Sequence, residues 1–308
     1  MPEITKQFAD FPVEHAFRHK LAPEGRESLA HILLFPEQQI AGFIYPSMLG
    51  TGEAKAIACF FGPHFPDQLV ESVEGIIPDD MNFDNWRLGP CHMEVAEAYK
   101  RVNIEWNGDL IKVKGSFTAT HPAYPFSMHP KGNPPYFGDN RTEQHGRFAV
   151  DVDLAGRTFH HDGLLIRDHS WGPRVWGLNQ HYKWIHATTG ESSMHFFEMQ
   201  GFGRTELRGF LFKDGAMRHI ASVDYDFVYD ENMLQKTFQV TVTDTEGRTS
   251  FITYEMFGVL QSSHDPKTCI NTGVATIVFD GVPGVGVCEF SWNKDYFDFA
   301  KGYVTRFG

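Results

Sequence analysis

Short runs in which apolar and polar residues alternate, separated by turn residues, extend along most of this chain. Aromatic residues make up 14% of it and fall into these runs rather than at helical spacing. Alternation with a period of two is typical of β-strands that have one buried face. Residues 32–35 and 41–45 flank a turn at 36–38, and a third run covers residues 54–61. The pattern predicts that the fold opens with three strands.

The dipeptide Asn107–Gly108 stands between two further runs, residues 91–105 and 109–120. An Asn-Gly pair readily adopts the positive φ angles of a tight two-residue turn, so these runs are predicted to form a β-hairpin. The stretch that follows, residues 121–145, contains repeated prolines and little periodicity. It predicts a long loop, placed to cover the mouth of a cavity.

Turn residues recur at regular intervals later in the chain, at 213–216, 229–232 and 244–247. Residues 273–279 and 286–292 form a last pair of alternating runs, and the short C-terminal segment after them is predicted to be helical. Regularly spaced runs of this kind predict an antiparallel meander that closes into a barrel.

The chain has 308 residues, of which 42% are hydrophobic, so it is long enough for two ordinary domains. The turn-like stretch at residues 177–180 favours a boundary there. We therefore predict an all-β protein with little helix, made of two antiparallel barrel domains, residues 1–180 and 181–308. A barrel of about eight strands has room for one small ligand, and the many aromatic side chains favour an apolar one.

The net charge is −12, and no run of lysine and arginine forms the basic stripe that a nucleic acid partner requires. The N-terminal residues lack the pattern of a signal peptide, and no apolar stretch approaches the ~20 residues that span a bilayer. The expected protein is cytoplasmic, with a small hydrophobic molecule as its partner, and its oligomeric state is left open.

No metal site and no cofactor are predicted. The four cysteines form no CxxC pair and are expected to be reduced. His160 and His161 would point to opposite faces of a strand, and His186 and His195 are single candidates without an evident third ligand.

Nucleotide and acyl-serine motifs are also missing. The glycines at 281–286 lack the GxGxxG order and precede a strand-like segment instead of a helix. Ser170 is not part of a GxSxG elbow.

The segment RDHSWGPR, residues 167–174, combines an acid, an imidazole, an indole and two guanidinium groups. It follows an apolar run and precedes Gly172–Pro173, which predicts that it lies at the end of a strand. Strand alternation would place Asp168 on one face and His169 on the other, unless the strand bulges. The alternative to a site is a structural plug, in which Trp171 closes the end of a barrel and Arg167 or Arg174 pairs with Asp168.

Residues 143–176 carry a DHSWG core that resembles the DHxWG motif of the AttH and carotenoid 1,2-hydratase group. The chain is most similar to bacterial members of that group, and residues 28–50 resemble their opening hairpin. Members of the group consist of two lipocalin-like barrels, which agrees with the two barrels predicted above. The resemblance implies an enzyme that acts without a redox cofactor on a hydrophobic molecule, often an isoprenoid or polyketide.

Such chemistry suggests a carboxylic acid that burial keeps neutral, so that it can protonate an alkene, with aromatic faces that stabilise the cation. We expect Asp168 to be this acid, on the argument that it is desolvated more than it is paired. The other expected site residues are His169 as partner, Glu143 as a second carboxylate from the edge of the loop, Arg167 and Arg174 as substrate-orienting groups, and Gln144, Trp171 and Trp176 as the wall. The resulting activity would be a hydratase, dehydratase, cyclase or isomerase.

Two other functions remain open on the sequence. A lipocalin-like carrier would hold the same ligand without changing it, because a binding barrel needs no acid. A pericyclase would shape its substrate without an obligatory proton transfer.

Overall fold

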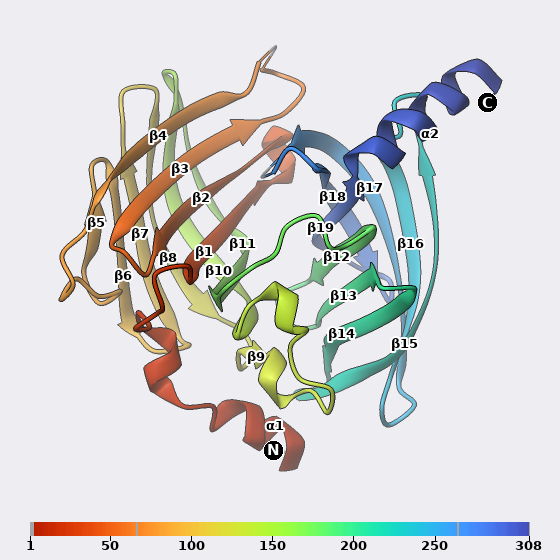
Figure 1. Cartoon of the computed structure of the whole chain (residues 1–308), viewed down its shortest axis with the longest axis horizontal. Coiled ribbons are helices and arrows are strands. Elements are labelled where there is room, and N and C mark those ends of the chain that lie inside the picture. Colours follow the sequence, from red (N-terminus) through yellow and green to blue (C-terminus); the bar gives the residue numbers. More distant parts are fainter. Residues whose placement is uncertain (1–2, 66, 264, 308) are drawn as a thin grey trace. The chain divides into compact units, whose positions relative to one another are not determined.

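The computed structural model describes residues 3–65, 67–263 and 265–307, which divide into two compact units, residues 1–174 and 175–308. Each unit is built on an antiparallel sheet, and the predicted all-β fold is confirmed (Figure 1). The sequence placed its domain boundary after residue 180. Residues 175–180 belong instead to the second unit, in the segment that precedes its first strand.

The first unit contains an eleven-stranded sheet with the order β4, β3, β2, β1, β11, β10, β8, β7, β6, β5, and β9 pairs with β10. Its strands are β1 (Arg26–Phe35), β2 (Ile40–Leu49), β3 (Glu53–Phe61), β4 (Leu69–Ile76), β5 (Trp86–Leu88), β6 (Cys91–Glu97), β7 (Arg101–Asn107), β8 (Ile111–Ala119), β9 (Tyr124–Pro125), β10 (Asn140–Leu154) and β11 (Arg157–Gly172). The three predicted opening strands are confirmed as β1, β2 and β3, with a 3-10 turn at Pro36–Gln38.

The predicted hairpin at Asn107–Gly108 is confirmed as β7 and β8, but the run 91–105 is not one strand, because β6 ends at Glu97 and β7 begins at Arg101. The turn is also not the expected two-residue type. The connection runs from Gly108 to Leu110, and Gly108 does not adopt a positive φ. Glu71 of β4 lies close to Gly108, and a Cβ at this position would overlap Glu71 Oε2, so a larger residue fits only if that carboxylate moves. Glu71 accepts hydrogen bonds from Trp106 Nε1 at 2.6 Å and from the Leu110 amide at 2.7 Å. This carboxylate thereby links β4, at one edge of the sheet, to the β7–β8 hairpin near the other edge.

The long loop predicted over residues 121–145 is shorter in the structure. It contains β9 and 3-10 turns at Phe126–Met128 and Pro135–Phe137, and β10 begins at Asn140. The register of β10 against β11, from Asn140↔Trp171 onward, places Glu143 and Gln144 inside a strand. The expectation that Glu143 lies at the edge of the loop was therefore wrong, because the polar sequence of this segment concealed a strand that is buried on both faces.

Alternation assigns one face of the sheet to the core of the first unit. This interior face carries Leu29, Leu33 and Leu165 on β1 and β11, which pack in the cluster formed with Trp86, Trp106, Phe117 and Phe148. All of these side chains are buried. The odd-numbered positions of β1 and β11 therefore point into the core, and the even-numbered positions point away from it.

The N-terminal segment lies across one end of this sheet (Figure 1). It contains α1 (Glu3–Ala9) and a 3-10 turn at Val13–Ala16. The Arg18 amide donates to Asn82 Oδ1 at 2.8 Å, and the Arg18 guanidinium donates to the carbonyls of Pro78 and Met81. These bonds fasten the segment to the connection between β4 and β5, and His19 beyond them contacts Glu27 of β1 and Trp171 of β11.

The second unit is a closed barrel in which each strand pairs with the next and β19 returns to β12. Its elements are β12 (His181–Thr188), β13 (Ser193–Gly201), β14 (Arg204–Lys213), β15 (Ala216–Tyr229), β16 (Gln235–Asp244), β17 (Thr249–Ser262), β18 (Thr268–Phe279), β19 (Val282–Asn293) and the helix α2 (Lys294–Phe307). The predicted meander and the predicted C-terminal helix are confirmed. An apolar core with Phe196, Phe238 and Phe290 fills the barrel.

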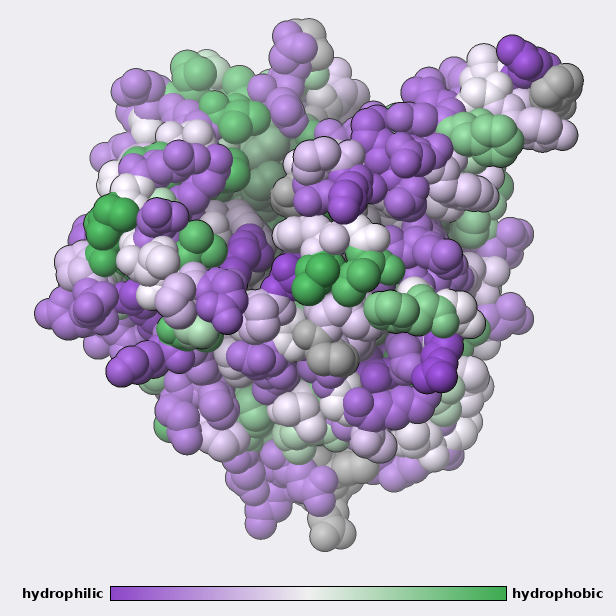
Figure 2. All heavy atoms as spheres, in the orientation of Figure 1, coloured by the Kyte–Doolittle hydropathy of each residue, from purple (hydrophilic) through white to green (hydrophobic). Residues whose placement is uncertain are grey.

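Hydrophilic residues dominate the face shown in Figure 2, and the hydrophobic residues on it form separate groups. Across the part of the chain that the structure describes, no helix combines the length and the apolar character needed to cross a membrane.

The role of Gly108 leads to a stability prediction. Gly108→Ala should displace the Glu71 carboxylate and leave the buried Trp106 indole N–H without its acceptor, at a cost of about 1–3 kcal/mol. Glu71→Ala should cost a similar amount for the same reason. Urea unfolding should show that the double variant is no less stable than the worse single variant. If the two losses simply add, Gly108 is required for a reason other than Glu71.

Candidate functional site

Residues 167–174 lie at the end of β11, as predicted, and the strand ends at Gly172, where φ is +100°. β11 pairs without a register shift with β1, from Arg26↔Gly172 to Leu33↔Leu165, and with β10 on its other side. No bulge interrupts the alternation of its side chains. The prediction that Asp168 and His169 point to opposite faces is confirmed, and this division creates two polar clusters.

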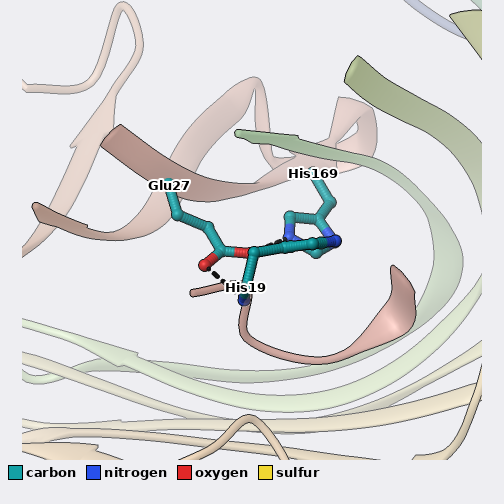
Figure 3. A group of neighbouring side chains, drawn as sticks. All are labelled: His19, Glu27 and His169. Carbon is teal, nitrogen blue, oxygen red and sulfur yellow. Dashed lines mark hydrogen bonds and ion pairs between the residues drawn. The ribbon is translucent and has the colours of Figure 1, made fainter. Parts of the chain in front are cut away.

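The first cluster lies on the interior face and joins His169 to Glu27 of β1 and to His19 of the N-terminal segment (Figure 3). Glu27 Oε1 lies 2.6 Å from His19 Nδ1 and 2.8 Å from His169 Nε2. Glu27 Oε2 accepts a hydrogen bond from the His19 amide at 3.0 Å. The Glu27 side chain is fully buried and that of His169 is 1% exposed. A carboxylate inside the core is thus satisfied by two imidazoles and one backbone N–H.

Charge and burial fix the protonation of this cluster. Burial acts to raise the pKa of Glu27, but the hydrogen bonds from His169 and His19 outweigh it, and the net pKa is lowered. Burial lowers the pKa of His169, and the bond to Glu27 only partly opposes this effect. Glu27 is therefore an anion and His169 is neutral at pH 7.

An ionised carboxylate only accepts hydrogen bonds, so the ring nitrogens that face it must carry the protons. His169 is then the Nε2–H tautomer, and its Nδ1 holds a lone pair. Among the residues that the structure describes, that buried Nδ1 atom has no hydrogen-bond partner.

The network continues from His19 toward solvent. His15 Nδ1 lies 2.9 Å from His19 Nε2, and the two rings stack at 5.2 Å. Trp171 stacks on His19 at 3.9 Å and lies 5.0 Å from the His169 ring, while Phe83 packs edge-on against His169 at 5.5 Å. His15 is half-buried. A hydrogen-bonded path therefore leads from a partly exposed imidazole to a buried one, through a carboxylate and beside an indole face.

The second cluster lies on the opposite face of the same strands. Asp168 forms an ion pair with Arg141 Nη2, and Arg141 Nε lies 3.0 Å from Glu143 Oε1. Glu143 and Asp168 are cross-strand neighbours on β10 and β11. The sequence argument expected Asp168 to be desolvated more than it is paired, but the structure gives this carboxyl a guanidinium partner. That partner is Arg141, from the segment predicted to be a loop, and not Arg167 or Arg174 as in the plug alternative.

Arg174 also lies on that side, where its Nη2 donates to Ser170 Oγ at 3.1 Å. Ser170 Oγ lies 3.1 Å from Ser28 Oγ, and Arg26 donates to the Tyr45 hydroxyl at 2.7 Å. Burial acts to raise the pKa of Tyr45, but Arg26 and Arg174 outweigh it and lower that pKa to about 8. Of the predicted wall residues, Trp171 and Gln144 lie on the interior face, whereas Trp176 follows β11 in the second unit.

Sequence analysis missed the two residues that complete the interior cluster, Glu27 and His19. A signal for Glu27 exists, since it is a charged residue in the mostly apolar strand ESLAHILLF, where a buried charge needs a partner. His19 carries no comparable signal, because it lies in an irregular segment whose position depends on tertiary contacts.

The interior cluster of His19, Glu27 and His169 is also a possible metal-binding set. Two imidazole nitrogens and a carboxylate oxygen lie within 4.8 Å of one another, and this combination suits a divalent transition metal. The sequence-based argument against a metal considered His186 and His195 and did not consider this set. Both nitrogens, however, already direct hydrogen bonds at the same oxygen, so a metal would have to replace both bonds.

Two open hollows of the first unit lie away from the interior cluster. One, of about 460 Å³, is lined by residues of β7, β8, β10 and β11 such as Lys112 and Asp151. The other, of about 480 Å³, is lined by residues of β1 to β4 such as Arg26 and Glu74. Neither hollow is lined by Glu27 or His169, so the candidate site is defined by the buried titratable groups rather than by these hollows.

A profile of the family described as a domain of unknown function (DUF7064) matches residues 12–294. The chain belongs to this family. No curated protein sequence matches it significantly.

Several solved structures share the fold of this DUF7064 member. An AttH protein from Nitrosomonas europaea has a TM-score of 0.63 at 13% identity, covering 86% of this chain and 91% of its own. CghA has a TM-score of 0.62 at 14% identity, covering 89% of each chain. Kievitone hydratase from Nectria haematococca has a TM-score of 0.60 at 8% identity, covering 87% of this chain and 89% of its own. The predicted resemblance to the AttH group is confirmed for the fold.

A buried imidazole beside this cluster predicts how stability depends on pH. His31 of β1 lies opposite Arg167 and is fully buried, and burial, aided by Arg167, lowers its pKa from 6.5 to about 3. Below pH 6.5 the unfolded chain binds a proton at His31 that the folded chain does not bind until about pH 3. The free energy of unfolding therefore decreases as the pH is lowered across that range.

At about pH 5 the loss from His31 should be about 2 kcal/mol relative to neutral pH. Thermal unfolding of His31→Gln should show a correspondingly flatter pH dependence. The matched control is His64→Gln at the exposed His64, and it should have the same pH dependence of thermal unfolding as the parent. Parallel pH profiles of His31→Gln and the parent would show that His31 is protonated equally easily in both states.

Proposed function

We propose that this protein is a cofactor-independent acid–base enzyme, a hydratase, dehydratase, cyclase or isomerase, that acts on a small hydrophobic molecule. The observation that carries the proposal is the buried Glu27–His169 pair, which leaves His169 Nδ1 with a lone pair and with no partner in the described part of the chain. His169 is the group proposed to exchange a proton with the substrate. Glu27 and His19 are positioning residues.

The pair has the features that proton transfer needs. Glu27 holds the His169 tautomer and orientation and stabilises the imidazolium that forms when Nδ1 takes a proton. Because the site is buried, this charge interaction is stronger than it would be in water. Burial also lowers the pKa of His169, so the group is already in its basic form at neutral pH.

The surroundings suit an apolar substrate that develops positive charge. Trp171 and Phe83 lie beside the His169 ring, and aromatic faces stabilise a nearby cation. The half-buried His15 connects the network to solvent through His19, which provides a route for the proton to be returned. The name of one structural relative, kievitone hydratase, is compatible with this class of reaction.

The expected role of Asp168 as the proton donor is replaced in this proposal by His169, because Asp168 is held in the ion pair with Arg141. A carrier without activity stays an alternative, since the interior aromatic residues suit a bound ligand as well as a reacting one. A pericyclase stays an alternative too, and incorporation of solvent deuterium into product would separate it from proton-transfer chemistry.

The proposal predicts opposite outcomes for neighbouring residues of β11. With a substrate found by screening small apolar molecules, His169→Gln and Glu27→Gln should each lower kcat by about 10²- to 10⁴-fold. Asp168→Asn should keep its turnover but lose stability, by at most about 3–5 kcal/mol, because Arg141 loses one of its two buried carboxylate partners and keeps Glu143.

Steady-state kinetics and thermal unfolding of the same preparations measure both effects. Asp168→Gln is not a suitable substitute for Asp168→Asn, since it adds a methylene to a packed site. A stable Asp168→Asn variant without turnover, together with an active His169→Gln variant, would assign the reaction to the outer cluster.

A chelation experiment tests whether the interior cluster works as hydrogen-bonding groups or as metal ligands. Exhaustive treatment with a chelator should leave turnover unchanged, because Glu27 Oε1 is already occupied by two N–H groups. Addition of zinc should inhibit by competing for the same nitrogens. Loss of activity on chelation, restored by one specific metal, would make His19, Glu27 and His169 a metal site.

A further inference from the structure

Arg167 is a buried guanidinium with an incomplete set of partners. It lies on the interior face of β11, two residues before His169, and is 3% exposed. Within residues 3–65, 67–263 and 265–307, its one hydrogen bond is from Nη1 to Gln144 Oε1 at 3.4 Å, and its buried Nε and Nη2 find no acceptor there. Buried polar groups in proteins are almost always hydrogen-bonded, and a buried charge almost always has a counter-charge.

The groups around Arg167 do not supply that counter-charge. Gln144, which is fixed by hydrogen bonds from its Nε2 to the carbonyls of Tyr99 and His121, is neutral. His31 lies directly across on β1 and is neutral at pH 7, with a pKa of about 3. Burial raises the pKa of Tyr99, so its phenol is neutral as well. Among the described residues, no carboxylate forms an ion pair with Arg167.

The guanidinium nevertheless stays charged. Burial lowers the pKa of Arg167 to about 10, which is far above neutral pH. A charged fork of N–H groups aimed into the core therefore remains available to an anionic oxygen group, and its planar geometry matches a carboxylate.

We propose that Arg167 binds the carboxylate of a small apolar acid, which is the substrate class of the site. The inference rests on the proposed function, because it assigns Arg167 and His169 to one molecule. Two residues on the same face of a strand are about 6.5–7 Å apart. A carboxylate on Arg167 would thus place a carbon a few bonds away beside His169 Nδ1, where its proton can be transferred.

Gln144 is the positioning residue for this group. Its amide nitrogen is held by two backbone carbonyls, so its Oε1 points at the Arg167 Nη1 atom. The guanidinium is thereby oriented from one side only, and the Nε–Nη2 edge is left for the ligand.

Octanoate and octan-1-ol test the proposal, because they have the same chain and differ in charge. Calorimetric titration of the full chain should give octanoate an affinity at least about tenfold higher than octan-1-ol. Arg167→Gln should abolish this preference by weakening octanoate binding about tenfold, with octan-1-ol unchanged. Inorganic phosphate serves as a second probe and should bind much more weakly than octanoate, since it lacks the apolar chain.

Stability gives a second readout that does not depend on binding. If Arg167 is an uncompensated charge, Arg167→Gln should raise the melting temperature, whereas loss of a structural ion pair would lower it. Equal binding of octanoate and octan-1-ol to the parent, or a large fall in melting temperature for Arg167→Gln, would overturn the proposal.

The Glu27→Gln variant separates this inference from the proposed function. It should bind octanoate as the parent does, because Glu27 does not contact Arg167, although its turnover should be lost. If Arg167 selects octanoate while Glu27→Gln stays fully active, the carboxylate site stands and the acid–base assignment fails. If Arg167→Gln binds octanoate as tightly as the parent does while Glu27→Gln is inactive, only the proposed carboxylate site is contradicted.

Discussion

The unbroken pairing of β11 with β1 and β10 is the constraint on which both polar clusters depend. Because no bulge interrupts it, alternation sends Arg167, His169 and Trp171 into the core of the first unit and Asp168 to the other face. Both faces are buried here, so every polar side chain on the strand needs a partner on its own side. A shift of one residue would exchange the two sets and leave a carboxylate and an imidazole without partners.

On the interior face, the fold brings together residues that lie far apart in the chain. Glu27 reaches His169 because β1 pairs with β11, and His19 reaches Glu27 because the N-terminal segment is fastened across the end of the sheet. A buried carboxylate is costly unless it is hydrogen-bonded, and here two imidazoles and an amide satisfy it. The arrangement holds His169 neutral and oriented, while Arg167 keeps an uncompensated charge two residues away.

Much of the fold could be predicted from the sequence, because alternation and turn chemistry are local properties. The opening strands, the β7–β8 hairpin and the barrel strands of the second unit follow from them. The first residues of β10 could not be predicted in this way, because the segment from Asn140 to Gln144 is polar although it is buried. That error also hid Arg141, and with it the ion pair that changes the interpretation of Asp168. His19 could not be foreseen, because its place depends on contacts between distant segments.

The tautomer of His169 is the most direct test of this account, because the proposed chemistry requires a neutral ring whose Nε2 is protonated and whose Nδ1 is free. Nitrogen NMR of ¹⁵N-histidine-labelled protein, with His169→Gln to assign the signals, reports both atoms at pH 7. The account predicts a neutral ring with the proton on Nε2 and a titration midpoint below the ordinary histidine value. A ring protonated on both nitrogens at pH 7, or one with its proton on Nδ1, would contradict it.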